Sequence, residues 1–260
     1  MKNLIILILF SYSLVSAQEV LTNTIELATG YKLGIPSGDM GVYIRQGHGF
    51  YFQGMFKPKP KLPLWIGANF DMLIYSSKTT RQEYVFPDNS VSNVDVNVSS
   101  SIYSYQMAFK YVFTDKNLIE PYAMLRMGGT TFSTDLYIED PRYPDECVAL
   151  EREHLHKSRT FNITPALGSR VFFNKSKFLF LDFSVGYTLG GDVTFMVPTL
   201  GEDMSNPVHD HSNHSNGETQ PYLVDFINRR TQVVHKHHVG NIYKSTFQMI
   251  QARIGIGICI

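Results

Sequence analysis

The stretch Ile250–Ile260, with the sequence IQARIGIGICI, decides the fold. An isoleucine or alanine stands at every second position, and Gln251, Arg253, two glycines and Cys259 stand between them. A period of two is typical of a β-strand, because successive side chains point to opposite faces of the sheet. The stretch therefore predicts a strand with one continuous apolar face and one face of small or polar residues.

The same alternation predicts seven further strands, at residues 25–35, 42–56, 64–75, 101–113, 119–132, 160–173 and 178–190. Short polar turns are expected at 57–63, 114–118 and 174–177. Asp, Asn, Ser, Pro and His are frequent in the longer connections, at 36–41, 76–100, 133–159 and 191–244. One or two helical turns could form within 145–158. Eight antiparallel strands with short turns at one rim and long extracellular loops at the other predict an all-β, up-and-down transmembrane β-barrel.

The size of the residues on the two faces predicts which face meets lipid. Large Phe, Tyr, Ile and Leu side chains dominate one face of the strands. The other face is rich in small residues, which suit the tight interior of an eight-stranded barrel and would be unusual on a solvent-facing wall. We expect the apolar face to point outward and the following residues to point inward: Gly30, Gly34, Gly49, Ser104, Ala108, Gly128, Ala166, Gly168, Ser184, Gly186, Gly190, Gly255 and Gly257.

Charged residues of both signs share the inward face. Buried charges have to be paired, so we expect a salt-bridge network that plugs the lumen and prevents the barrel from acting as an open porin. A proton relay is the functional alternative. The predicted lumen charge network comprises Glu26, Lys32, Arg45, Asp71, Lys110, Arg126, Arg170, Asp182 and Arg253.

The first residues have the pattern of a secretory signal peptide. Lys2 gives a positive start, Leu4–Phe10 is an unbroken apolar run, and Ala17 precedes the expected cleavage site. The apolar run is too short to span a bilayer as a helix. We therefore expect a signal peptide at 1–17 and one barrel domain at 18–260, exported to the outer membrane.

Charge and cysteine content exclude other classes of protein. Lys+Arg and Asp+Glu both number 23, so the formal net charge is zero. A nucleic-acid partner is not expected, because nucleic-acid binders usually carry a basic excess. Two cysteines are too few for a disulfide scaffold or a Cys-rich zinc site.

The signal-peptide pattern, the eight alternating strands, the short turns and the strand at the C-terminal end resemble small bacterial outer-membrane β-barrels of the OmpA/OmpX type. The resemblance covers residues 18–260, and Ile260 departs from the aromatic residue with which that family usually ends. It implies an outer-membrane protein in contact with membrane lipid, with a role in envelope integrity, in adhesion or as an accessory subunit of an envelope complex. Contacts with other envelope proteins would run through the long loops, since loops on a rigid scaffold commonly carry binding.

Two other function classes stay open. His156 and Ser158 resemble the His-x-Ser site of outer-membrane lipid A deacylases, which are eight-stranded barrels. Both residues fall on the inward face or in a loop, away from a lipid substrate, so we do not expect a lipid-modifying enzyme. The other alternative is a secreted soluble β-barrel that binds a small ligand.

The last long connection is rich in histidine. Imidazoles at this spacing could bind a divalent metal such as zinc, nickel or copper if the loop folds back on itself. An exposed hydrophilic loop without metal explains the same composition, and no other cofactor is expected. The candidate ligands are His209, His211, His214, His235, His237 and His238.

Overall fold

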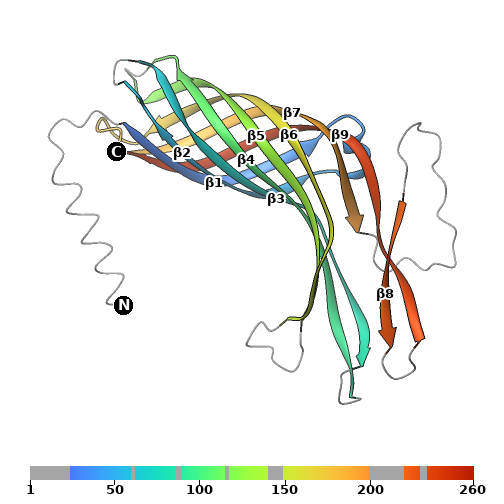
Figure 1. Cartoon of the computed structure of the whole chain (residues 1–260). Helices are drawn as coiled ribbons and strands as arrows, with labels where there is room; N and C mark the ends of the chain where they lie inside the picture. Colours follow the sequence, from blue (N-terminus) through green and yellow to red (C-terminus); the bar gives the residue numbers. More distant parts are fainter. Residues whose placement is uncertain are drawn as a thin grey trace, which may run out of the picture.

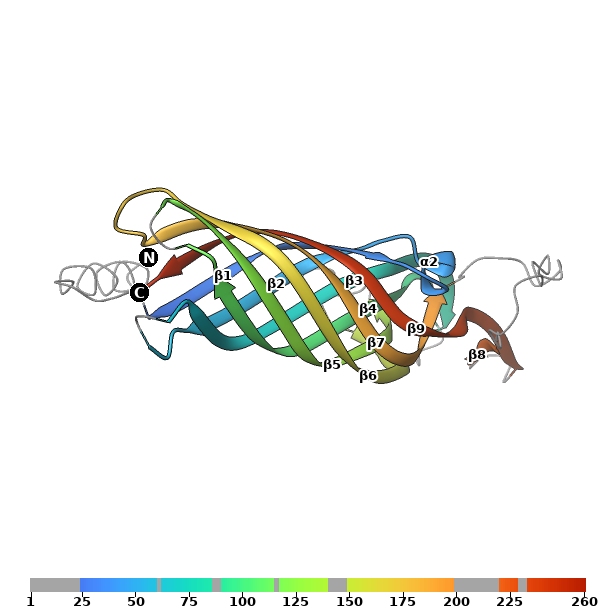
Figure 2. The same ribbon diagram turned by 90° about the horizontal axis from the view of Figure 1, so that it is seen from above.

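The chain folds into a closed antiparallel β-barrel, seen from the side in Figure 1 and from above in Figure 2. This computed structural model describes residues 24–59, 62–85, 90–114, 117–139, 149–198, 220–228 and 233–260. The strands follow the order β1-β2-β3-β4-β5-β6-β7-β9, and β9 pairs back with β1 to close the barrel. The predicted eight-stranded up-and-down barrel is confirmed.

The barrel strands differ widely in length. About 9–11 residues suffice for a strand that crosses a membrane, so the longer strands extend beyond that thickness. The elements are β1 (Ile25–Pro36), α2 (Met40–Tyr43), β2 (Gly47–Phe56), β3 (Leu64–Val85), β4 (Val91–Val112), β5 (Ile119–Glu139), β6 (Ala149–Phe172), β7 (Leu179–Pro198), β8 (Gln220–Asn228) and β9 (Val233–Cys259). Across the described ranges, the structure contains no helix with the length and apolarity of a transmembrane helix.

The long strands continue beyond the closed barrel as two arms (Figure 1). One arm contains the ends of β3, β4, β5 and β6, and the other contains β8 and the ends of β7 and β9. Pairing between β6 and β7 ends at Asn162 and Gly190; β6 continues outward beside β5, and β7 continues beside β9. β8 pairs with β9 beyond the point where β1 stops, so it stands outside the closed barrel. Irregular registers bend strands, and they occur where the arms begin: at Ile74/Ser76, Thr134/Asp135 and Leu189/Asp192.

The predicted loops are wrong in three places. Most of 76–100 and 133–159 is strand, because β3, β4, β5 and β6 continue into an arm. Within 191–244, residues 191–198 belong to β7, residues 220–228 form β8 and residues 233–244 belong to β9, so every described part of this connection is strand. The expected helical turns are also absent from 149–158, which belong to β6, while 145–148 lie outside the described residues. Residues 42–43, predicted as the start of a strand, end the single turn α2.

The outward and inward faces of the barrel have opposite polarity. Leu167 is 65% exposed and Phe161 is 60% exposed on the outer side of β6. Lys32 and Arg126 are fully buried in the lumen. The predicted orientation, with the apolar face outward, is therefore confirmed, and it is the reverse of the arrangement in a water-soluble barrel.

Candidate functional site in the lumen and the outer wall

Five charged side chains form an ionic cluster at the end of the lumen where β1 begins and β9 ends. Glu26 accepts hydrogen bonds from Lys110 and from Arg170, whose Nη1 lies 2.5 Å from Glu26 Oε2. Arg170 Nη2 lies 2.5 Å from Glu120 Oε2, and Lys177 Nζ lies 2.6 Å from Glu120 Oε1. Each carboxylate therefore binds two cations, which is the arrangement that offsets the loss of hydration on burial.

Aromatic rings surround the same cluster. The Arg170 guanidinium lies 5.1 Å from the ring centroid of Trp65, 5.5 Å from that of Phe172 and 5.8 Å from that of Phe180. Cations at such distances are attracted to the electron-rich ring faces. The rings and ion pairs together fill this end of the lumen.

A second set of ion pairs lies on β1, β3 and β9. Asp71 accepts from Lys32 at 2.8 Å and from Arg253 at 2.6 Å, and Arg253 also donates to Asn69 at 2.8 Å. The Arg253 guanidinium lies 4.8 Å from the ring centroid of Tyr51. All three charged side chains are almost completely buried.

Asp182 is held by two tyrosines. Tyr51 donates its hydroxyl to Asp182 at 3.1 Å, and Tyr122 donates its hydroxyl at 2.7 Å. Within the described ranges, Asp182 forms no salt bridge. Its place in the network is therefore that of a hydrogen-bond acceptor between β2 and β5.

A layer of amides and hydroxyls crosses the middle of the lumen. Gln106 on β4 donates to Asn162 and, at 3.3 Å, to Thr164 on β6. The hydroxyls of Thr164 and Thr188 lie 2.9 Å apart, and Gln251 on β9 donates to Thr188. The layer links the inner faces of β4, β6, β7 and β9.

Buried apolar side chains pack together inside the end of the barrel nearest the arms. Phe132 and Phe247 meet at right angles, with ring centroids 5.2 Å apart. The backbone of β7 crosses this region and accepts hydrogen bonds at Met196 from Tyr75 and Ser100, each at 3.0 Å. We call this set the apolar cluster; its buried members are Met40, Ile44, Leu73, Ile102, Phe132, Val193, Phe195, Phe247 and Met249.

The predicted lumen residues divide into two groups. Eight of the nine are buried inside the barrel, whereas Arg45 is exposed and lies between α2 and β2, because the chain has not yet entered the strand there. Sequence reasoning missed Glu120 and Lys177. Glu120 shares the period of two with Arg126, so the pattern could have identified it, whereas Lys177 lies in a turn that has no period.

Half of the predicted histidine ligands lie outside the described residues. His209, His211 and His214 are not described, and for the other three the backbone alone is described, in β9 opposite β8. Within the described chain, no three His, Cys, Asp or Glu side chains form a group that could hold a metal.

His156 and Ser158 both bond to β7. His156 Nε2 lies 3.1 Å from Thr194 Oγ1, and the Thr194 amide donates to Ser158 Oγ at 3.2 Å. The two side chains thus tie the outer part of β6 to β7 through one residue.

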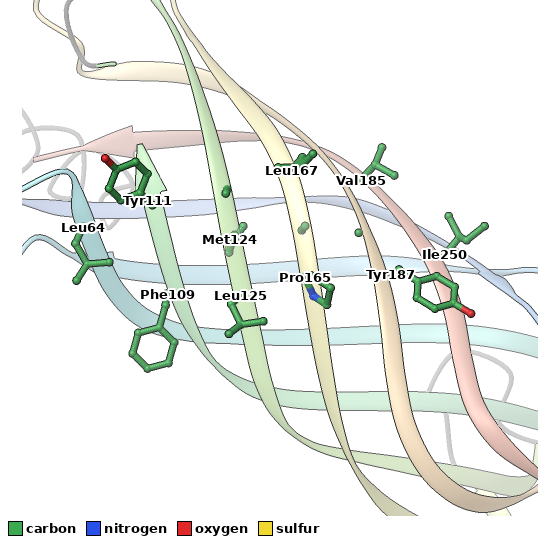
Figure 3. A pocket seen from close by; sticks show the side chains of 13 residues that line it. Leu64, Phe109, Tyr111, Met124, Leu125, Pro165, Leu167, Val185, Tyr187 and Ile250 are labelled. Carbon is green, nitrogen blue, oxygen red and sulfur yellow. The ribbon is translucent and has the colours of Figure 1, made fainter. Parts of the chain in front are cut away.

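The outer wall carries an apolar groove of about 790 Å³ across β4, β5, β6, β7 and β9 (Figure 3). Two rows of side chains border the groove. One row contains Tyr111, Leu167 and Val185, and the other contains Phe109, Leu125, Pro165, Tyr187 and Ile250. Ala123 on β5 pairs with Tyr111 on one side and Leu167 on the other, and its small side chain leaves room for the groove.

Three solved structures illustrate what the chain is similar to. Neisserial surface protein A is 9% identical, with a TM-score of 0.41, over 91% of this chain and 97% of its own. OprG, an outer membrane protein from Pseudomonas aeruginosa, is 8% identical, with a TM-score of 0.42, over 92% and 96%. A major outer membrane protein from Thermus thermophilus is 9% identical, with a TM-score of 0.40, over 91% and 99%.

No protein-family model matches the sequence, and no curated protein matches it significantly. At TM-scores of 0.40 to 0.42, the assignment of the fold rests on the closed strand order of this chain.

Proposed function

We propose that the chain is an outer-membrane β-barrel with a closed lumen and a structural or binding role. The observation that carries this proposal is the polarity of the barrel, which is apolar outside and charged inside. In the outer membrane, the barrel would contribute to envelope integrity, act in adhesion or serve as an accessory subunit of a larger envelope complex.

Membrane lipid is the partner that the outer wall fits best. Large apolar side chains are exposed on all eight barrel strands, including Tyr105, Met107 and Leu167 at 57–65%. Exposed apolar surface on this scale is unfavourable in water and suits the hydrocarbon of a bilayer. The groove in Figure 3 is lined almost entirely by apolar atoms, so acyl chains fit it.

A closed lumen argues against a pore. The ionic cluster fills one end, the amide and hydroxyl layer crosses the middle, and the apolar cluster fills the other end. Eight strands leave an interior that side chains just fill. The barrel would therefore act through its surface.

The arms are the part of the surface best suited to a protein partner. β3 beyond Ile74 has an edge that pairs with no neighbouring barrel strand in the described chain, whereas β6 before Asn162 has no backbone pairing with β7 and contacts it through the side chains of His156 and Ser158. Unpaired edges can accept a strand from another protein. Metal binding by the histidine-rich connection remains a separate proposal, and zinc titration of the barrel against a loop deletion tests it.

Two measurements on the purified chain test the proposal. A membrane barrel extracted in detergent should migrate faster on a gel before boiling than after, and in planar bilayers it should show no steady conductance. Steady ion current would overturn the closed lumen. A protein that stays soluble without detergent would instead support the soluble ligand-binding barrel. Altered lipid A in cells that overproduce the chain would support the lipid-modifying enzyme.

A further inference from the structure

Arg126 is a buried cation without a carboxylate partner among the described residues. Its side chain is fully buried, and its Nη2 donates to Gln251 Oε1 at 3.3 Å. Its Nε and Nη1 make no hydrogen bond within the described part of the chain. Arg170 and Arg253, the other buried arginines of the lumen, each bind a carboxylate at 2.5 or 2.6 Å.

The balance of buried charges shows the same excess. The four carboxylates are Glu26, Asp71, Glu120 and Asp182, and the five cations are Lys32, Lys110, Arg126, Arg170 and Arg253. Three of the carboxylates bind cations other than Arg126, and the fourth binds two tyrosines. An unpaired charge in a water-poor interior is strongly unfavourable, so the fifth cation calls for a counter-ion.

Small and neutral residues flank Arg126 in the described part of the chain. Its cross-strand neighbours are Ala108 on β4 and Thr164 on β6. The guanidinium reaches past β6 to Gly186 on β7, where an added Cβ would lie 3.2 Å from Nη2. Gly186 pairs in turn with Gln251, which already contacts the guanidinium.

We propose that Arg126 holds a small inorganic anion, such as a halide, inside the lumen. The guanidinium N–H groups that lack partners would donate charge-assisted hydrogen bonds to the anion, and the anion would neutralise the fifth cation. The ionic cluster and the apolar cluster close the lumen on either side, so the anion enters while the barrel folds. The proposed anion site requires only the folded barrel, so it does not rest on the proposed function in the outer membrane.

Refolding in different salts tests the proposal, with bromide as the probe. The full chain is refolded into detergent micelles in sodium bromide or in sodium gluconate of equal ionic strength, and urea unfolding is followed. When the bromide concentration is well above the dissociation constant of the site, the unfolding equilibrium constant of the wild type should fall about tenfold for each tenfold rise in bromide concentration. Arg126→Met should abolish this dependence. Arg45→Met, the same change at an exposed arginine, should retain it.

Anomalous diffraction from crystals of the protein refolded and crystallised in bromide gives a second readout that does not require a variant to fold. A bromide peak within hydrogen-bonding distance of Arg126 Nη1 or Nε is the expected result. Water without an anomalous signal at these atoms would overturn the proposal. Equal bromide dependence of the wild type and Arg126→Met would also overturn it.

Discussion

The two ends of the lumen contain different kinds of interaction. At the end where β1 begins and β9 ends, Glu26 and Glu120 bind three cations between aromatic rings. At the end nearest the arms, Phe132 and Phe247 pack within an apolar cluster. The first end depends on every charge keeping its partner, whereas the second depends on shape and volume. Mutations should therefore weaken the two ends in distinguishable ways.

Loss of the central carboxylate should have the largest effect. Glu26→Gln leaves Lys110 and Arg170 in the lumen with one anion fewer, and breaking a buried ion pair in this way costs about 3–5 kcal/mol. Urea unfolding in detergent, followed by gel mobility, measures the loss. A double variant, Glu26→Gln with Lys110→Met, should recover part of it, because it removes one of the unpaired cations. No recovery would contradict the role assigned to charge pairing.

Truncation of an apolar side chain should weaken the other end. Phe132→Ala removes a buried ring from the apolar cluster and should cost about 3 kcal/mol through lost burial and the cavity left behind. Phe132→Leu, which keeps most of the volume, should cost less. The same unfolding assay distinguishes the two, and equal losses would show that packing does not close this end.

A methyl group in the middle of the wall should have an intermediate effect. A Cβ at Gly128 would lie 2.1 Å from the Tyr105 carbonyl oxygen and 2.7 Å from Gln106 Cα. Both atoms belong to the backbone of β4, so the strands would have to move apart, and Gly128→Ala should cost about 1–3 kcal/mol. Gly129→Ala is the control, because an added Cβ there meets no atom within 4 Å. Equal stability of both variants would contradict the close approach of β4 and β5.

The smallest effect should come from the rim of the ionic cluster. Lys177 is partly exposed, and Glu120 keeps Arg170 when Lys177 is replaced. Lys177→Gln should therefore lower the free energy of unfolding by less than about 1 kcal/mol. A loss as large as that of Glu26→Gln would mean that the rim pair, and not the buried carboxylate, closes this end.

The sequence predicted best which side chains of the barrel strands point into the lumen and which point outward. A period of two placed eight of the nine predicted charges in the lumen, because side chains alternate between lumen and exterior along the regular parts of the barrel strands. The pattern failed at Arg45, which precedes β2, and at the arms, where Val94, Val96 and Val98 continue the alternation beyond the barrel.

Which charge meets which partner was not predictable. Glu26 and Arg170 lie on strands far apart in the chain, and their contact depends on the stagger of all eight strands. The lack of a carboxylate partner for Arg126 in the described barrel could not be predicted either, because Arg126 occupies the same inward position in the strand alternation as the paired cations. Pairing within the lumen is therefore a property of the closed barrel.

The central claim is that the apolar outer face meets lipid, and one pair of arginine substitutions tests it most directly. Leu167 lies within the barrel part of β6 and is 65% exposed, whereas Val42 is 70% exposed in α2, at the rim. In liposomes, Leu167→Arg should lower the free energy of unfolding by about 2–4 kcal/mol and Val42→Arg by no more than about 1 kcal/mol. Equal, near-zero losses for both variants would contradict a lipid-facing wall.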